Sequence, residues 1–233
     1  MNFEEGEVLL VNKPLNWTSF DVVNKIRFAL KNKYGVKMKV GHAGTLDPLA
    51  TGLLIICTGK MTKQIDAFTG LDKEYTGTFY IGATTPTYDS EQAIDTSYPI
   101  GHINEQLLFE TIKPFIGEIE QIPPIYSAIK IDGTAAYIKA RKGKSVEMKS
   151  RSVTIKEFEL TAIALPQVDF RVVCSKGTYI RSLAYDFGKA LNSGAYLSSL
   201  CRTKIGAFHL RDAWEIDKLT QAIFDEPSED LTS

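Results

Sequence analysis

The longest apolar run of the chain, Gly52–Cys57 (GLLIIC), limits the folds that this sequence can adopt. It falls well short of the roughly 18–20 apolar residues that a membrane-spanning helix needs. A short apolar run that follows a glycine-rich loop is typical of a buried strand. We therefore expect a core built around a sheet, and no membrane span.

Segments with strand and helix patterns alternate irregularly around this run. The strand patterns cover 8–12, 74–82, 152–160 and 168–175, and the helix patterns cover 18–30, 60–68, 104–117 (ending near Pro114) and 180–191. Thr18, Ser19 and Asp21 are alternative N-caps of the first helix. Irregular alternation argues against a doubly wound parallel sheet. It predicts the α+β class, with a mixed, mainly antiparallel central sheet flanked by helices and loops.

The termini and the cysteines indicate a cytoplasmic protein. The N-terminus, MNFEEGEVLL, lacks the basic start of a signal peptide. The three cysteines, Cys57, Cys174 and Cys201, show no CxxC spacing. We expect reduced thiols and no zinc site.

The net charge of −1 hides strong local imbalances. Residues 130–156 carry eight basic and two acidic side chains, and 25–63 are rich in lysine. The end of the chain, 212–233, carries seven acids and one lysine, and we expect poor order beyond Leu219. Local clusters rather than totals attract phosphate, so the two basic stretches predict surfaces that bind nucleic acid. The alternative is that each is an ordinary solvated face.

Asp47 is the sole acidic residue between Asp21 and Asp66, in the stretch KVGHAGTLDPLATG. Positive neighbours favour an ionised carboxylate with a lowered pKa, which suits a nucleophile or an electrostatic stabiliser. Glycines in the stretch allow tight turns and close approach of a ligand. The alternative is a plain turn residue, as aspartate before proline often is.

Three common catalytic designs do not fit this stretch. The histidines accompany no GxSxG nucleophile elbow, and no GxxxxGK[ST] phosphate loop occurs. A glycosidase would need a second carboxylate nearby. What remains is a reaction run by one carboxylate without metal or cofactor, such as an isomerisation.

Six ordered motifs resemble those of the TruB family of RNA pseudouridine synthases. They extend from residue 9 to about 210 and are listed here in chain order: LLVNKPLNWTSFDVV, GHAGTLDPLATGLL, KEYTGTFYIG, QIPPIYSAIKIDG, CSKGTYIRSLAYDFG and LCRTKIGAF. The resemblance implies the pseudouridine synthase fold. It also implies isomerisation of a uridine in tRNA, at position 55 of the T-loop in bacterial members.

The resemblance assigns catalytic roles to Asp47, Tyr75 and Arg181. Asp47 is then the nucleophile, attacking the sugar C1′ or the base C6 of an extruded uridine, because chemistry on a base requires it to leave its stack. Tyr75 stacks on the uracil, where stacking contributes about 1–3 kcal/mol; otherwise it is a core aromatic. Arg181 pairs with Asp47. A cation at the start of a helix is disfavoured by the dipole, which is a separate hint of a special role.

Four further residues match substrate-binding positions of the family. His42 contacts flipped-out bases, Tyr179 and Leu200 line the uracil pocket, and Lys13 braces the site or contacts RNA. Structural roles in the core are the alternative for the histidine, the tyrosine and the leucine. The basic segment 130–156 corresponds to an RNA-clamping insertion.

The resemblance also predicts the domain organisation and the partners. Residues 1–212 form the catalytic domain, and 213–233 are a short acidic tail in place of the C-terminal PUA domain of longer members. We expect tRNA, through its T-arm stem-loop, as the partner. We expect no cofactor, no metal, no membrane contact and no obligate protein partner, and a monomeric state.

Two other classes of function would use the same features. An RNA-folding chaperone would need the basic clusters and aromatic residues but not Asp47. A nucleoside or N-glycoside hydrolase would use Asp47 and release free uracil. Asp47→Asn separates the first from an isomerase, and the reaction products separate the second.

Overall fold

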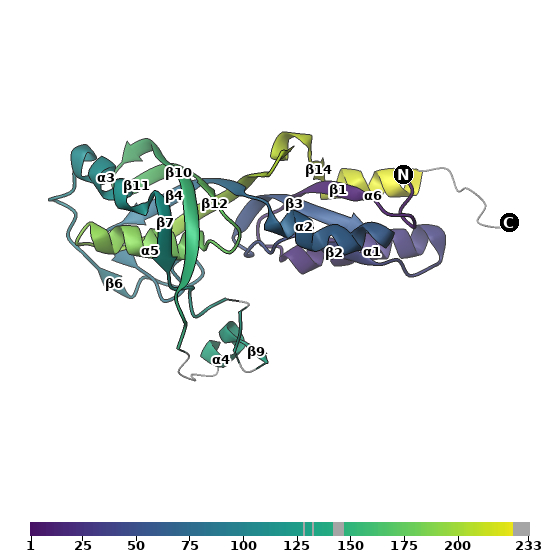
Figure 1. Cartoon of the computed structure of the whole chain (residues 1–233), viewed down its shortest axis with the longest axis horizontal. Helices are drawn as coiled ribbons and strands as arrows, with labels where there is room; N and C mark the ends of the chain where they lie inside the picture. The colour runs from purple at the N-terminus through teal and green to yellow at the C-terminus, as the bar shows by residue number, and fades with distance from the viewer. Residues whose placement is uncertain (128, 132, 142–146, 226–233) are drawn as a thin grey trace. The chain divides into compact units, whose positions relative to one another are not determined.

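In the computed structural model, the apolar run lies within strand β3 (Ala50–Thr58), as predicted. The structure describes residues 1–127, 129–131, 133–141 and 147–225. The chain forms two compact units. The first unit is Met1–Lys73 with Cys201–Ser233, and the second is Glu74–Leu200. Both combine helices with strands of a mixed, mainly antiparallel sheet, which confirms the predicted α+β class (Figure 1).

Four strands are successive neighbours in the first unit: β14 (Trp214–Glu215), β1 (Val8–Lys13), β3 and the end of β12 (Ala195–Ile205). β1 runs antiparallel to β3 and parallel to β14. β2 (Val40–His42) pairs with β3, and β13 (Phe208–His209) pairs with β12, both antiparallel.

β3 is buried on both faces, which explains its unbroken apolar sequence. Leu54 and Ile56 pack into a cluster with helices α1 (Ser19–Tyr34) and α6 (Ile216–Asp225). Leu53, Ile55 and Cys57 point to the other face. There the predicted 60–68 helix is observed as a 3₁₀ turn η1 (Gly59–Gln64) followed by α2 (Ile65–Gly70).

α1 begins and ends at standard caps. Thr18 is the N-cap: its hydroxyl accepts a hydrogen bond from the Asp21 amide, and the Asp21 carboxylate accepts one from the Thr18 amide. Gly35 ends the helix with φ +73°. The capping box selects Thr18 from the three predicted candidates.

Among the described residues, no helix is long and apolar enough to span a membrane.

Part of the predicted acidic tail is ordered. Strand β14 and helix α6 occupy 214–225, and Ile216, Leu219 and Ile223 are buried in the core cluster with α1. The expected poor order beyond Leu219 is therefore wrong for Thr220–Asp225. Acidic side chains on the outer face of an amphipathic helix account for the charge of this segment. Residues 226–233 lie outside the described residues.

Five strands are successive neighbours in the second unit: the start of β12, then β4 (Lys73–Ile81), β11 (Gln167–Cys174), β10 (Arg151–Ala164) and β7 (Gly117–Gln121). β10 is antiparallel to both β11 and β7. A separate ribbon joins β5 (Ala83–Thr84) to β6 (Thr96–Ser97). These strands confirm the predicted strand patterns at 74–82, 152–160 and 168–175.

An aromatic cluster forms the core of the second unit. The rings of Phe79 on β4 and Phe170 on β11 stack at 4.1 Å, and Phe187 packs against Phe79 at 5.6 Å. Phe187 lies on α5 (Ile180–Ala190), the predicted amphipathic helix. The predicted 104–117 helix is observed as α3 (Glu105–Ile112) and the 3₁₀ turn η2 (Lys113–Phe115), which contains Pro114. The packing of α5 onto the sheet fixes the first turn of α5, where Arg181 lies.

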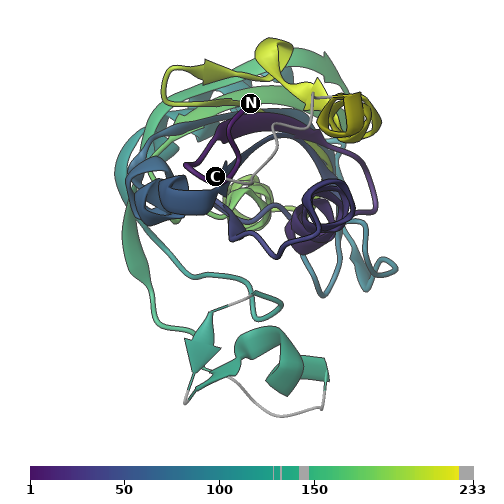
Figure 2. The ribbon, with the colours of Figure 1, turned by 90° about the vertical axis from the view of Figure 1, so that its right-hand side faces the viewer.

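The basic segment 130–156 covers most of the connection between the paired strands β7 and β10 and the first six residues of β10. It begins with the short strands β8 (Lys130–Ile131) and β9 (Thr134–Ala135) and helix α4 (Ala136–Arg141). Both views show α4 and β9 standing off from β7 and β10 (Figure 1, Figure 2). Lys142 and Lys144 lie outside the described residues.

Candidate active site

Asp47 lies in the loop that joins β2 to β3. Its carbonyl accepts a hydrogen bond from the Ala50 amide at 3.1 Å, which closes a tight turn around Pro48. Gly52 follows with φ +104°, and a Cβ there would come within 2.4 Å of the Arg202 carbonyl oxygen. A glycine is therefore required at this position near the start of β3, because no side chain fits between it and the Arg202 backbone on β12.

Two buried side chains fasten the loop before Asp47. Ser19, at the start of α1, accepts a hydrogen bond from the Leu46 amide at 2.8 Å and donates one to the Leu46 carbonyl at 3.3 Å. Arg202 donates from Nη2 to the Gly44 carbonyl at 3.1 Å and from Nε to the Leu53 carbonyl at 2.7 Å. Arg202 is 1% exposed. The loop is thus held at both ends by groups that cannot shift without leaving buried carbonyls unpaired.

Lys13 fastens the loop after Asp47. Its side chain is fully buried, and Nζ donates to the carbonyls of Trp17 at 2.6 Å, Pro14 at 2.9 Å and Pro48 at 3.4 Å. The Asn16 amide also donates to Pro48, at 2.8 Å. These contacts support the bracing role predicted for Lys13 rather than direct contact with RNA.

Burial lowers the pKa of Lys13 from 10.5 to about 8, and the charge of Arg202 adds to this effect. The charges of Asp47 and Asp21 act in the opposite direction. Lys13 is thus a partly destabilised cation that the Asp47 carboxylate helps to keep protonated.

We expect the stability of wild-type protein relative to Lys13→Met to rise between about pH 8 and pH 10.5. Over this range the unfolded chain still holds the lysine proton and the folded chain has lost it, so the free energy of unfolding rises with pH, by up to about 3 kcal/mol. Urea unfolding of both proteins at pH 7 and pH 10 measures the difference. Lys31→Met, at an exposed lysine of α1, is the control. If the difference in the free energy of unfolding between wild type and Lys13→Met were the same at pH 7 and pH 10, the lowered pKa of Lys13 would be contradicted.

His42 ends β2, five residues before Asp47. The imidazole is half-buried, and burial together with the nearby Arg202 charge lowers its pKa. A neutral ring at neutral pH is compatible with contact to an uncharged base, which is the role predicted for His42 from the family resemblance. Arg202 therefore acts on three predicted site residues: it holds the loop of Asp47 and lowers the pKa of Lys13 and the pKa of His42.

The second unit carries the other predicted residues. Arg181 lies in the first turn of α5 and is 5% exposed. Its Nη1 donates to the Thr87 carbonyl at 3.2 Å and lies 3.5 Å from the Asp89 carboxylate, and its Nη2 donates to the Tyr126 carbonyl at 2.9 Å. These acceptors compensate for a cation at a helix start. The predicted pairing of Arg181 with Asp47 joins residues of different units and stays a prediction.

Tyr75, Tyr179 and Leu200 belong to three elements of the second unit. Tyr75 is a buried residue of β4, Tyr179 is the N-cap of α5, and Leu200 lies on β12. The backbone of Tyr179 bonds to both ends of the Gln121 side-chain amide, at 2.7 and 3.1 Å. The Arg151 guanidinium lies over the Tyr179 ring at 5.2 Å, which adds a cation–π contact.

Sequence reasoning did not identify Ser19, Arg202 or Asp89 as site residues. The sequence predicts only a helix-capping role for Ser19, and it assigns no role to Arg202, which lies in the motif LCRTKIGAF. Asp89 did carry a signal, because it is the first acid after Glu74 along the chain. The contacts of all three join segments far apart in sequence, so no local pattern reveals which groups these side chains contact.

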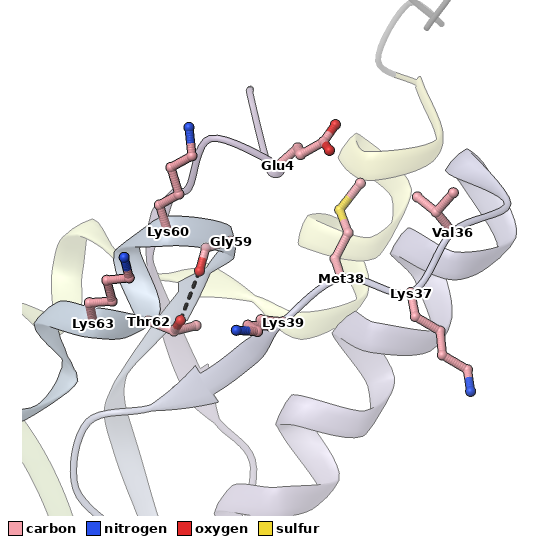
Figure 3. A pocket seen from close by; sticks show the side chains of 9 residues that line it. All are labelled: Glu4, Val36, Lys37, Met38, Lys39, Gly59, Lys60, Thr62 and Lys63. Carbon is pink, nitrogen blue, oxygen red and sulfur yellow. Dashed lines mark hydrogen bonds between the residues drawn. The ribbon is translucent and has the colours of Figure 1, made fainter.

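Four lysines of the predicted basic stretch line one hollow of the first unit, with a volume of about 650 Å³. The nine lining residues are Glu4, Val36, Lys37, Met38, Lys39, Gly59, Lys60, Thr62 and Lys63 (Figure 3). Lys39, next to β2, points toward Thr62 on η1, which also carries Lys60 and Lys63 (Figure 3). Lys60 is paired with Glu5 at 2.7 Å, whereas Lys39 and Lys63 have no ion pair among the described residues. The hollow therefore offers unpaired positive charge in reach of an anion.

The family model described as TruB family pseudouridylate synthase (N terminal domain) matches residues 31–180, more than half of the chain. This chain belongs to the TruB family. The resemblance read from the six motifs is thereby confirmed.

Among the described residues, no group of three or more histidine, cysteine, aspartate or glutamate side chains could hold a metal ion.

Two curated relatives cover the chain almost completely. The tRNA pseudouridine synthase B of Flavobacterium johnsoniae is 62% identical over 221 residues, covering 94% of this chain and 96% of the relative. That of Phocaeicola vulgatus is 54% identical over 232 residues, covering 99% of each chain. The second match covers nearly the whole chain, so the similarity continues beyond residue 180 and includes α6.

Two solved structures share the fold. A Cbf5–Nop10–Gar1 complex gives a TM-score of 0.72 at 30% identity over 95% of this chain. An H/ACA RNP bound to a substrate RNA containing 2′-deoxyuridine gives 0.68 at 27% over 94%. This chain spans 55% and 53% of those chains, about half of each. The predicted pseudouridine synthase fold is confirmed.

Proposed function

We propose that this chain converts uridine 55 in the T-loop of tRNA to pseudouridine, with Asp47 as the nucleophile. Membership of the TruB family and 62% identity to a tRNA pseudouridine synthase B make the chain an isomerase of uridine in tRNA. The T-loop target, the single aspartate and base flipping go further and belong to the proposal.

The braced loop of Asp47 carries the proposal. Serine, arginine and lysine side chains hold the backbone on both sides of one carboxylate, and the strand that leads into this loop ends at a histidine whose protonation is disfavoured. Reacting groups need to be held within a fraction of an ångström, and buried hydrogen bonds to backbone supply such rigidity. A plain turn residue would need none of these supports.

The proposed reaction breaks one bond and makes another within a single nucleotide. Asp47 attacks C1′ of the sugar or C6 of the base, the N1–C1′ bond breaks, and the base turns. A C5–C1′ bond then forms, C5 loses its proton, N1 gains one, and the Asp47 carboxylate is released. No atom or electron is gained overall, so one nucleophile suffices.

The second unit supplies the other proposed roles. Tyr75 stacks on the extruded uracil, and Tyr179 and Leu200 line its pocket, which offsets the few kcal/mol that flipping costs. Arg181 keeps the Asp47 carboxylate ionised and oriented. Its position is supported by Asp89, Thr87 and Tyr126, which hold the guanidinium in place.

The lysine-lined hollow and the basic segment 130–156 are the proposed surfaces for the RNA backbone. Lys39→Gln with Lys63→Gln should weaken tRNA binding and leave kcat unchanged. Removal of two phosphate contacts should reduce the slope of log Kd against log salt by about 1.5. Binding titrations from low to moderate salt measure it. Lys113→Gln, at a lysine paired with Glu110 in the second unit, is the control. Unchanged salt dependence would remove the hollow from the binding surface.

The test of the proposed function is incubation with unmodified tRNA followed by position-resolved mapping of pseudouridine. We expect one modified position, uridine 55, and no free uracil. Conversion elsewhere in the tRNA would refute the T-loop target, and released uracil would favour an N-glycoside hydrolase. Refolding of tRNA without any pseudouridine would favour a chaperone.

The remaining predictions from the sequence complete the proposal. We propose a single catalytic domain over 1–212, and the acidic segment 213–233 that follows it packs its helix α6 against α1. The enzyme acts as a monomer on the T-arm and needs no cofactor. It works in the cytoplasm.

A further inference from the structure

Tyr88 has a backbone conformation that its residue type disfavours. Its φ is +63°, a left-handed value that tyrosine rarely adopts. A residue held in such a conformation requires surrounding contacts that over-determine it, and these often cluster at functional sites. Tyr88 directly precedes Asp89, the carboxylate that faces Arg181.

The turn around Tyr88 fixes the direction of the Asp89 side chain. The Tyr88 amide donates to the Thr85 carbonyl at 3.1 Å, and the Thr85 hydroxyl donates to the Asp89 carbonyl at 2.6 Å. The Leu197 amide donates to the Tyr88 carbonyl at 2.9 Å. One carboxylate oxygen of Asp89 accepts from the Glu91 amide at 3.0 Å, and the other lies 3.5 Å from Arg181 Nη1. The left-handed step at Tyr88 is thus part of the geometry that presents Asp89 to Arg181.

The Tyr88 ring connects this turn to the helix of Arg181. It stacks on the Tyr185 ring at 4.2 Å between centroids, with 19° between the planes. Tyr185 lies four residues after Arg181 on α5, so both side chains share one face of the helix. The turn therefore contacts two side chains of α5. The Thr87 carbonyl and the Asp89 carboxylate contact Arg181, and the Tyr88 ring contacts Tyr185.

We propose that Tyr88 is a positioning residue for the isomerisation. Its stack on Tyr185 holds the turn 85–89 in the conformation that presents Asp89 and the Thr87 carbonyl to the Arg181 guanidinium. The inference rests on the proposed function, in which Arg181 orients the nucleophile. Tyr88 acts through Asp89 and Arg181, and it does not touch the substrate. The stack offsets the disfavoured backbone conformation.

The test separates the ring from the backbone by four substitutions. Tyr88→Phe keeps the stack, Tyr88→Ala removes it, and Tyr88→Gly removes it while making a left-handed φ favourable. Tyr185→Ala removes the other ring. Single-turnover rates at saturating tRNA report the chemical step, and KM reports the binding of RNA.

We expect Tyr88→Phe to react within about twofold of the wild-type rate. Tyr88→Ala, Tyr88→Gly and Tyr185→Ala should each slow the chemical step about tenfold or more, with KM changed less than twofold, because a small misplacement of a catalytic group has effects of this size. The double variant Tyr88→Ala/Tyr185→Ala should be no slower than the slower single variant, since both substitutions remove one contact.

A second stacked pair in the same unit provides the matched control. The rings of Tyr80 and Tyr196 stack at 5.1 Å with 22° between planes, on β4 and β12. Tyr80→Ala should lower the melting temperature and leave the chemical step unchanged. Melting curves of all variants show that each is folded at the assay temperature.

Three outcomes would overturn the inference. Full activity of Tyr88→Ala would show that the stack is not needed. Recovery in Tyr88→Gly would show that the backbone alone matters. A change confined to KM would show that the ring contacts RNA. Asp47→Asn and Arg181→Lys, assayed in parallel, distinguish failure of the proposed function from failure of the role of Tyr88. If these two variants stay active, the proposed catalytic roles are wrong. If they are inactive while Tyr88→Ala is active, only the inference on Tyr88 is wrong.

Discussion

Asp47→Asn should abolish pseudouridine formation, by about 10⁴-fold or more, while tRNA binding changes less than twofold. The amide has nearly the shape of the carboxylate but is not a nucleophile, so the covalent step is lost and the fit of the RNA remains. Loss of tritium from C5-labelled uridine in tRNA measures the reaction, because the base rejoins the sugar through C5. A filter-binding titration measures tRNA affinity.

Two further variants make this result decisive. Asp66→Asn alters an exposed carboxylate in the first turn of α2, in the same unit, and should keep full activity. Asp47→Ala should be as inactive as the asparagine variant. Sustained conversion by either Asp47 variant would show that another group is the nucleophile. Loss of RNA affinity with the same variants would show that the carboxylate has a structural part in the loop.

Arg202→Met should lower both the stability and the activity. The substitution removes the Arg202 donor from the buried Leu53 carbonyl and from the half-buried Gly44 carbonyl. Each unsatisfied carbonyl costs about 1–3 kcal/mol, so we expect the free energy of unfolding to fall by about 2–6 kcal/mol. Urea unfolding measures this change. Activity should fall in folded protein as well, because the loop before Asp47 loses one of its fastenings.

The same variant should raise the pKa of His42. The positive charge of Arg202 lowers that pKa in the wild-type protein, so its removal acts in the opposite direction. NMR titration can follow His42 because the chain has three histidines. Arg211→Met, at a largely exposed arginine of the same unit, should change neither stability nor the titration. A loss of stability below about 0.5 kcal/mol in Arg202→Met would contradict the role of Arg202 in holding the loop.

Local patterns predicted much of the secondary structure. The spacing of Val22, Ile26 and Leu30 predicted α1, and all three are buried. The run in β3 was identified as a buried strand, and the two core clusters on its faces show why it is apolar throughout. The prediction was wrong where tertiary packing decides: α6 is ordered past Leu219 because it buries Ile223 against the α1 cluster, although its composition is acidic.

The sequence by itself determined the family, the fold class and the residues proposed to react. These properties are recorded in short motifs and in periodic burial, which depend on near neighbours along the chain. The tertiary structure decided how the proposed nucleophile is held. Arg202 reaches carbonyls 149 and 158 residues away, Ser19 reaches one 27 residues away, and Asp89 meets Arg181 across the second unit. Buried polar groups choose partners by position in space, so no pattern along the chain could have revealed these pairs.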